Sequence, residues 1–151
     1  MKFQLHNACE GMGLRVSYFN MLESEADLEQ AERRLTNLLE RRLRFARLYK
    51  SEDEDANAWL RLTVSVYGHV YAMRIEYLKD LYDPSSATTG VAGTWSKSTL
   101  GTAGDDQSLW ESKASKHVDD FLTEFLSVNA DHCGEAAERP DKEPAKDSDA
   151  T

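Results

Sequence analysis

Two pairs of histidine and cysteine stand near opposite ends of this 151-residue chain, and they contain its only cysteines. His6 precedes Cys9 by three residues, and His132 is adjacent to Cys133. All four side chains are of types that zinc accepts as ligands. Two adjacent residues rarely face one tetrahedral ion, however, and the C-x-x-C spacing of structural zinc sites is missing. We therefore expect no metal and no other cofactor, which leaves a disulfide or two free thiols.

The other candidates for catalysis do not form a recognised arrangement. His69 lies in a predicted turn, and His117 lies on a predicted helix beside Asp119, where a solvated helix edge is the common explanation. No G-x-S-x-G nucleophile motif occurs, and the glycine-containing turns lack the spacing of a phosphate loop. The sequence thus predicts no catalytic residue and a protein that is not an enzyme. A hydrolase with an irregular active site around His69 or His117 is the alternative.

Arginines are concentrated in one predicted helix, although the chain carries a net charge of −9. Arg34, Arg41 and Arg44 recur at helical spacing and share one side of it. The simplest interpretation is a solvated face paired with Glu32 and Glu40. The functional interpretation is a docking face for an acidic protein, or for peripheral contact with anionic lipid headgroups at a membrane surface.

Hydrophobic periodicity indicates which elements must position these residues. Leu14 to Phe19 alternates apolar and polar residues, as a half-buried strand does. Ser24 is a candidate N-cap, and the residues after it show the apolar spacing of a long amphipathic helix. The remaining elements are two strands in 59–82, a loop at 83–93, a third strand at 94–100 and a second helix at 108–133.

The two strands in 59–82 predict their own register. Gly68 and His69 suit a two-residue turn, and counting outwards from it places Arg61 opposite Glu76, an opposite-charge cross-strand pair. The same register puts the apolar residues of both strands on one side of the sheet, as in Val66 opposite Tyr71 and Leu62 opposite Ile75. A slip of one residue would destroy both agreements.

The predicted fold class is therefore α+β: a two-layer β-α-β-β-β-α sandwich with a mostly antiparallel sheet and two helices on one face. We divide the chain into a leader (1–13), a single domain (14–133) and a disordered acidic tail (134–151). The other sheet face is expected to be polar, and either solvated or used for contact. With the helix arginines it defines the candidate partner face: Arg34, Arg41, Arg44, Arg61 and Arg74.

Composition excludes some classes of function. An acidic chain lacks the broad basic face that binds nucleic acid, and no apolar run approaches the length of a membrane span. The first residues have no apolar core of the kind found in signal peptides. We therefore expect either a cytoplasmic protein or the mature form of an exported one.

The predicted positions of Cys9 and Cys133 favour export. Cys9 comes just before the first strand and Cys133 ends the last helix, and the two ends of a two-layer domain are often close together. A disulfide between them would join both ends of the domain and is typical of an oxidising compartment such as the periplasm. Free thiols in a cytosolic protein are the alternative.

The order of elements resembles the small α/β modules of bacterial cell-envelope proteins. The similar stretches are VSVYGHVYAMRIEYLKDLYDPSS, then TWSKSTLG, then HVDDFLTEFLSVN. They resemble the N-terminal domain of the periplasmic propeller protein of the Tol-Pal system, and envelope lipoproteins of secretion or transport. The resemblance implies an assembly or binding module rather than an enzyme, and it transfers no functional residue. LHNAC departs from a lipobox, so lipidation of Cys9 is not expected.

Together these observations predict a non-enzymatic exported protein of the periplasm or envelope that acts through protein–protein contact. The alternative is a cytosolic inhibitor or immunity-type protein that neutralises a basic partner. The sequence assigns neither the partner nor the oligomeric state.

Overall fold

A computed structural model describes residues 2–7, 9–52, 54–102 and 107–133 of the chain. The predicted disordered tail, 134–151, lies outside these residues. The described elements in chain order are α1 (Lys2–Leu5), β1 (Gly13–Asn20), α2 (Glu25–Phe45), β2 (Ala58–Tyr67), β3 (Val70–Asp83), β4 (Thr88–Thr102) and α3 (Gln107–Val128).

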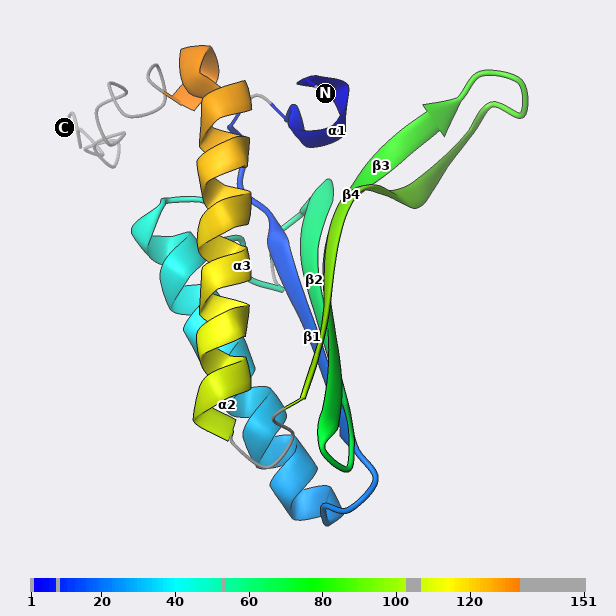
Figure 1. Cartoon of the computed structure of the whole chain (residues 1–151). Coiled ribbons are helices and arrows are strands. Elements are labelled where there is room, and N and C mark those ends of the chain that lie inside the picture. The colour runs from blue at the N-terminus through cyan, green and yellow to red at the C-terminus, as the bar shows by residue number, and fades with distance from the viewer. Residues whose placement is uncertain (1, 8, 53, 103–106, 134–151) are drawn as a thin grey trace, which may run out of the picture.

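The four strands form one sheet in the order β1-β2-β3-β4. β1 runs parallel to β2 because α2 carries the chain back between them, whereas the β2–β3 and β3–β4 pairs are antiparallel. Both long helices lie on the same side of the sheet, which leaves the other side open (Figure 1). The α+β fold class is confirmed, and α1 is the one element that was not predicted.

α2 forms where its capping and its apolar spacing agree. The Ser24 side chain accepts a hydrogen bond from the Asp27 amide, as predicted for an N-cap, and acidic residues occupy the first turn. Four apolar side chains, one turn apart, are buried against the sheet: Ala31, Leu35, Leu39 and Leu43. The apolar spacing predicted a helix as far as Lys50, but the helix ends at Phe45, and Arg47 adopts a positive φ of 58°.

The β2–β3 hairpin has the predicted register throughout. Leu62 pairs with Ile75, Val66 with Tyr71, and Arg61 with Glu76. Gly68 adopts a positive φ of 59° in the turn, a conformation that glycine accepts without steric cost. Turn chemistry and hydrophobic alternation therefore specify the same pairing.

The core lies between the sheet and the helix layer, and aromatic side chains fill much of it. Phe121 and Phe125 of α3 pack on Tyr77 of β3, and the centroids of their rings lie 5.6 and 5.8 Å, respectively, from the centroid of the Tyr77 ring. At the other end of α3, Trp110 stacks on Tyr18 of β1 at 5.1 Å. These contacts hold α3 on the sheet at β3 and at β1.

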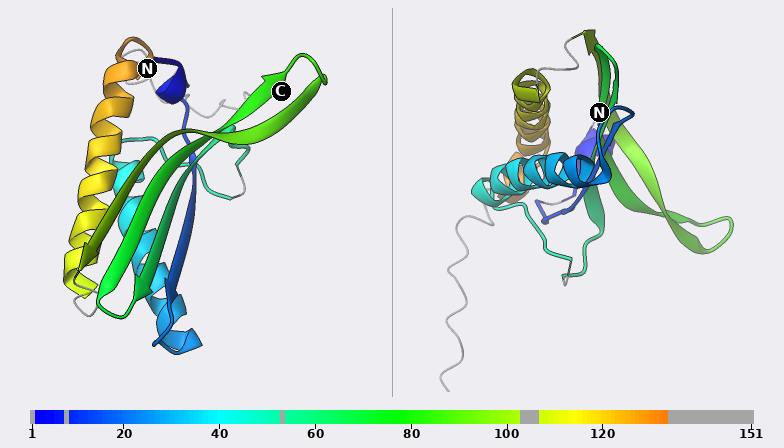
Figure 2. Two further views of the ribbon diagram at one scale, coloured as in Figure 1. Left: turned by 45° about the vertical axis from the view of Figure 1, so that its right-hand side comes forward. Right: turned by 90° about the horizontal axis from the view of Figure 1, so that it is seen from below.

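The predicted loop at 83–93 was wrong. β3 continues to Asp83 and β4 starts at Thr88, so most of this stretch is strand. The turn is confined to 84–87, where the Asp83 carboxylate accepts hydrogen bonds from Ser85 and Ser86. Beyond a bulge at Thr94 the two strands continue as a two-stranded arm, 80–91, that projects from the body (Figure 2). Gly90 and Gly93, which fall within the predicted loop, are residues of β4.

Candidate functional site

The open face of the sheet has a charged centre. The Arg61 guanidinium donates to Oε2 of Glu76 through Nε at 2.8 Å and Nη2 at 2.6 Å, which confirms the predicted cross-strand pair. Arg74 contacts the other carboxylate oxygen at 3.0 Å. Glu76 is buried between the two arginines. Towards the arm, the Arg15 guanidinium lies 5.2 Å from the centroid of the Trp59 ring. Among the described strand residues of this face, basic side chains therefore outnumber acidic ones.

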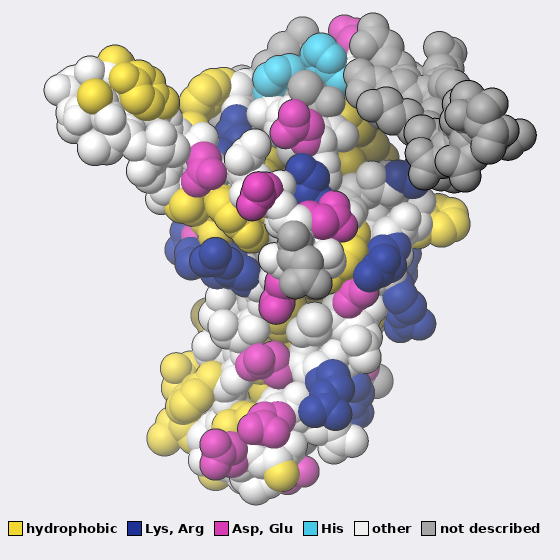
Figure 3. Space-filling model, turned by 180° about the vertical axis from the view of Figure 1, so that it is seen from behind, with side chains coloured by type: hydrophobic (Ala, Val, Ile, Leu, Met, Phe, Trp, Pro, Cys, Tyr) yellow, Lys and Arg dark blue, Asp and Glu magenta, His cyan; other side chains and the backbone are white. Residues whose placement is uncertain are grey.

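The end of this face away from the arm is apolar, although the sequence predicted a polar surface throughout. Phe19, Tyr67, Val70 and Leu100 are exposed here, and Leu100 keeps 75% of its surface accessible. The Phe19 and Tyr67 rings lie 5.9 Å apart. We call these four residues the apolar end. Hydrophobic side chains gather here, at the lower left of Figure 3. The prediction rested on the polar residues in the middle of the strands, whereas the positions of the open side near the strand ends carry apolar residues.

A hollow of about 510 Å³ connects the charged centre with the apolar end. Its floor consists of small side chains, and Arg74 and Leu100 stand at its two ends. The residues that line it are Thr63, Ser65, Ala72, Met73, Arg74, Ser98, Thr99 and Leu100. Cationic and apolar contacts are thus available side by side on one face.

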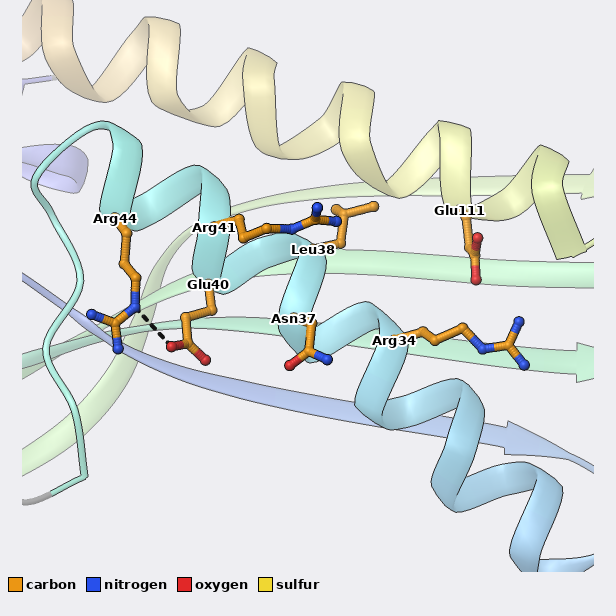
Figure 4. Close-up of a pocket in the computed structure, with 7 residues that line it drawn as sticks. All are labelled: Arg34, Asn37, Leu38, Glu40, Arg41, Arg44 and Glu111. Carbon is orange, nitrogen blue, oxygen red and sulfur yellow. Dashed lines mark hydrogen bonds and ion pairs between the residues drawn. The ribbon is translucent and has the colours of Figure 1, made fainter.

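The helix arginines lie on a different face of the protein. Arg34, Arg41 and Arg44 border a hollow of about 640 Å³ on the outer side of the helix layer, together with Asn37, Leu38, Glu40 and Glu111 (Figure 4). Arg44 pairs with Glu40 at 2.8 Å. The structure therefore divides the predicted partner face in two: Arg34, Arg41 and Arg44 on the helices, and Arg61 and Arg74 on the open sheet.

A disulfide joins Cys9 to Cys133, with 5.0 Å between their Cα atoms. The N-terminal segment that we predicted as a leader is packed on the domain beside it. Leu5 is buried, and the Asn129 side chain donates to its carbonyl oxygen at 3.0 Å. The Lys79 ammonium donates to the carbonyl oxygens of Phe3 and His6, and burial lowers its pKa. Asn129 and Lys79 carried no signal in the sequence that would identify this role.

The two histidines beside the cysteines are close together but do not belong to a larger donor cluster. The rings of His6 and His132 lie 5.4 Å apart, edge to face. Within the part of the chain that the structure describes, no group of three or more His, Cys, Asp or Glu residues is placed to hold a metal ion.

His117 is buried, not at a solvated helix edge as predicted. Its Nε2 lies 2.6 Å from the Thr99 hydroxyl of β4, and its Nδ1 has no hydrogen-bond partner among the residues that the structure describes. Burial, with a smaller effect from the Lys97 ammonium, lowers the pKa of the imidazole below its ordinary value. Helical periodicity alone did not reveal that this helix position faces β4.

The buried imidazole predicts a pH dependence of stability. Because the folded pKa of His117 lies below its unfolded value of 6.5, protonation favours the unfolded chain. The free energy of unfolding is therefore expected to be highest above pH 6.5 and to decrease as the pH falls from there through the lowered folded pKa. His117→Gln, whose amide does not titrate, should decrease less over the same range. Urea unfolding at a series of pH values measures this, and equal slopes for both proteins would contradict it.

Comparisons with known proteins give no family. No protein-family model and no curated protein matches the chain. Within the described residues, no helix has both the length and the apolar character needed to cross a membrane.

Several solved structures share part of the arrangement. PelC from Paraburkholderia phytofirmans, described as a dodecamer, is 16% identical with a TM-score of 0.37 and covers 81% of this chain and 90% of its own. Rare lipoprotein B from Shewanella oneidensis is 15% identical with a TM-score of 0.29, covering 79% and 97%. A putative lipoprotein from Caulobacter crescentus is 11% identical with a TM-score of 0.28, covering 92% and 97%. The similar structures thus include lipoproteins, but such low TM-scores carry no argument about family, function or assembly.

Proposed function

We propose that this protein is a non-enzymatic, exported interaction module that binds a protein partner through the open face of its sheet. The apolar end is the observation that carries this proposal. Single exposed apolar residues are normal, whereas a contiguous apolar cluster on an uncovered face is typical of a protein interface. Phe19, Tyr67, Val70 and Leu100 come from all four strands and form such a cluster.

The chemistry next to the cluster supports protein recognition. Interfaces combine an apolar centre with aromatic and arginine side chains that make directed contacts. Here Arg74 stands at the end of the hollow opposite Leu100. Arg61 and Arg74 are held in place by Glu76, so little side-chain entropy is lost when a partner binds them. A partner that offers an apolar anchor and a carboxylate fits this surface.

The helix hollow is less well suited to an anionic partner. Glu40 and Glu111 stand among its arginines, and Arg44 is already paired with Glu40 and lies 4.5 Å from the ring centroid of Tyr49. A partner would have to compete with these contacts. The open face is therefore the surface we assign to binding.

Photo-cross-linking in cells that produce the protein distinguishes the two surfaces. A photoreactive phenylalanine analogue at position 100 should form an adduct with a protein, whereas the analogue at position 37, in the helix hollow, should not. Both positions are exposed, so the analogue is tolerated at each. Adducts from position 37 alone, or from neither position, would overturn the assignment of the open face.

Export depends on the oxidation state of the cysteines. A disulfide between residues 124 positions apart is expected to persist in an oxidising compartment and to be reduced in a cytosol. Protein taken from its native cells under acid quench should contain no alkylatable thiol before reduction, and two after it. Free thiols in most molecules would contradict export and leave the binding proposal intact.

A further inference from the structure

The arm formed by β3 and β4 has little support from the rest of the protein. β2 pairs with β3 only as far as Lys79, and the Asp80 amide donates to the Asn57 carbonyl oxygen at 2.9 Å. Beyond it, Leu81 to Asp83 pair with β4 alone among the described strands. Tyr82 is 64% exposed, and Val91 is exposed as well. A two-stranded ribbon is marginally stable in water by itself. Hydrophobic side chains at its tip, at the upper left of Figure 3, would gain stability from a surface to pack on.

The apolar side chains of the arm belong to the same side of the sheet as the open face. Successive side chains along a strand point to opposite sides of the sheet. Asp80 and Tyr82 lie four and six positions after Glu76, so they are on the same side as Glu76. Val91 pairs with Asp80 and shares its side. The open side thus carries one apolar cluster on the arm and another at the apolar end.

The arm and the open face also have complementary charges. From 80 to 93 the chain contains Asp80 and Asp83 and no lysine or arginine. The centre of the open face has Arg15, Arg61 and Arg74 against the single carboxylate of Glu76. The arm therefore has both properties, apolar and acidic, that the open face is suited to bind. It projects away from the body and does not contact the apolar end of its own chain (Figures 1 and 2).

We propose that the arm of one copy docks on the open face of a second copy, in a reciprocal two-fold pair. This rests on the proposed function and names the partner. Glu76 is six residues from Val70 and six from Tyr82 on β3, about 20 Å each way along the strand. A two-fold axis near Glu76 places each Tyr82 over the partner's apolar end. It also places each Asp80 near the partner's Arg74.

Sedimentation velocity of the oxidised full chain over a concentration series tests this proposal. The expected mass is twice the chain mass of 17.1 kDa. Tyr82→Asp on the arm and Leu100→Asp on the face should each weaken association roughly ten-fold or more, because each places a charge in an apolar contact. Phe45→Asp, at a residue 93% exposed on the helix layer, should leave association unchanged. A single-chain mass at every concentration, or unchanged association of both variants, would overturn the proposal.

An equimolar mixture of the two variants gives a sharper result. A mixed pair has one contact between the intact arm of the Leu100→Asp chain and the intact face of the Tyr82→Asp chain, and one contact that carries both substitutions. Because a single charge already disrupts a contact, each variant alone has two disrupted contacts and the mixed pair has only one. The mixture should therefore associate more strongly than either variant does separately. No gain on mixing would overturn arm-to-face docking.

Failure of this inference can be distinguished from failure of the proposed function. If the purified protein is a single chain and the adduct at position 100 contains a different protein, the self-association is wrong and the open face remains the binding surface. An adduct with the mass of two chains supports both.

Discussion

Replacing both Cys9 and Cys133 by serine is expected to lower the free energy of unfolding by about 3 to 5 kcal/mol. The disulfide closes a loop of 124 positions, so its loss releases a large conformational entropy in the unfolded chain. The same change should loosen the packed segment around Leu5, which Asn129 and Lys79 hold on the domain. Urea unfolding of the oxidised protein and of the variant measures the difference.

The control for this experiment is reduction. A thiol reductant should destabilise the parent protein by a similar amount and should have no effect on the serine variant. If the parent and the variant unfold at the same urea concentration, the disulfide contributes nothing to stability, and the N-terminal segment is held by its hydrogen bonds alone.

Phe121→Ala is the second change for which we expect a large effect, about 3 to 5 kcal/mol of unfolding free energy. The ring is fully buried and packs on three aromatic rings, those of Tyr77, Trp95 and Phe125. Its removal leaves a cavity between α3 and the sheet that the surrounding rings cannot close completely.

Phe45→Ala is the matched control, because the same atoms are removed from a side chain that is 93% exposed. Its effect should stay within about 0.5 kcal/mol. Both values come from chemical denaturation of the oxidised proteins. Equal losses at the two positions would contradict the placement of α3 against the sheet.

The parts of the fold that were predictable from sequence are those where two local signals agree. The β2–β3 register follows from the turn at Gly68 and from alternation, and Arg61 opposite Glu76 is a further consequence of it. α2 follows from the Ser24 cap and its apolar stripe. The disulfide follows from the positions of its cysteines at the two ends of the predicted domain.

The functional surface was less predictable because it depends on contacts between distant residues. Gly90 and Gly93 are typical of a loop, and cross-strand pairing overrides that preference in β4, whereas Pro84 lies in the turn that its type favours. The predicted layer order already separated the arginines of α2 from those of the sheet, but it did not reveal the apolar end or the hollow that connects it with the charged centre. His117 and Lys79 are polar residues that long-range packing buries, and no local pattern distinguishes them from exposed ones.

The most direct test of the open face as a binding surface is hydroxyl-radical footprinting of Phe19 and Phe45. Both are exposed phenylalanines, one on the open face and one on the helix layer. We expect oxidation of Phe19 relative to Phe45 to be several-fold lower in intact producing cells than in dilute purified protein, because a bound protein covers Phe19. An equal ratio in the two conditions would show that the open face is solvated in the cell and would contradict its role as the binding surface.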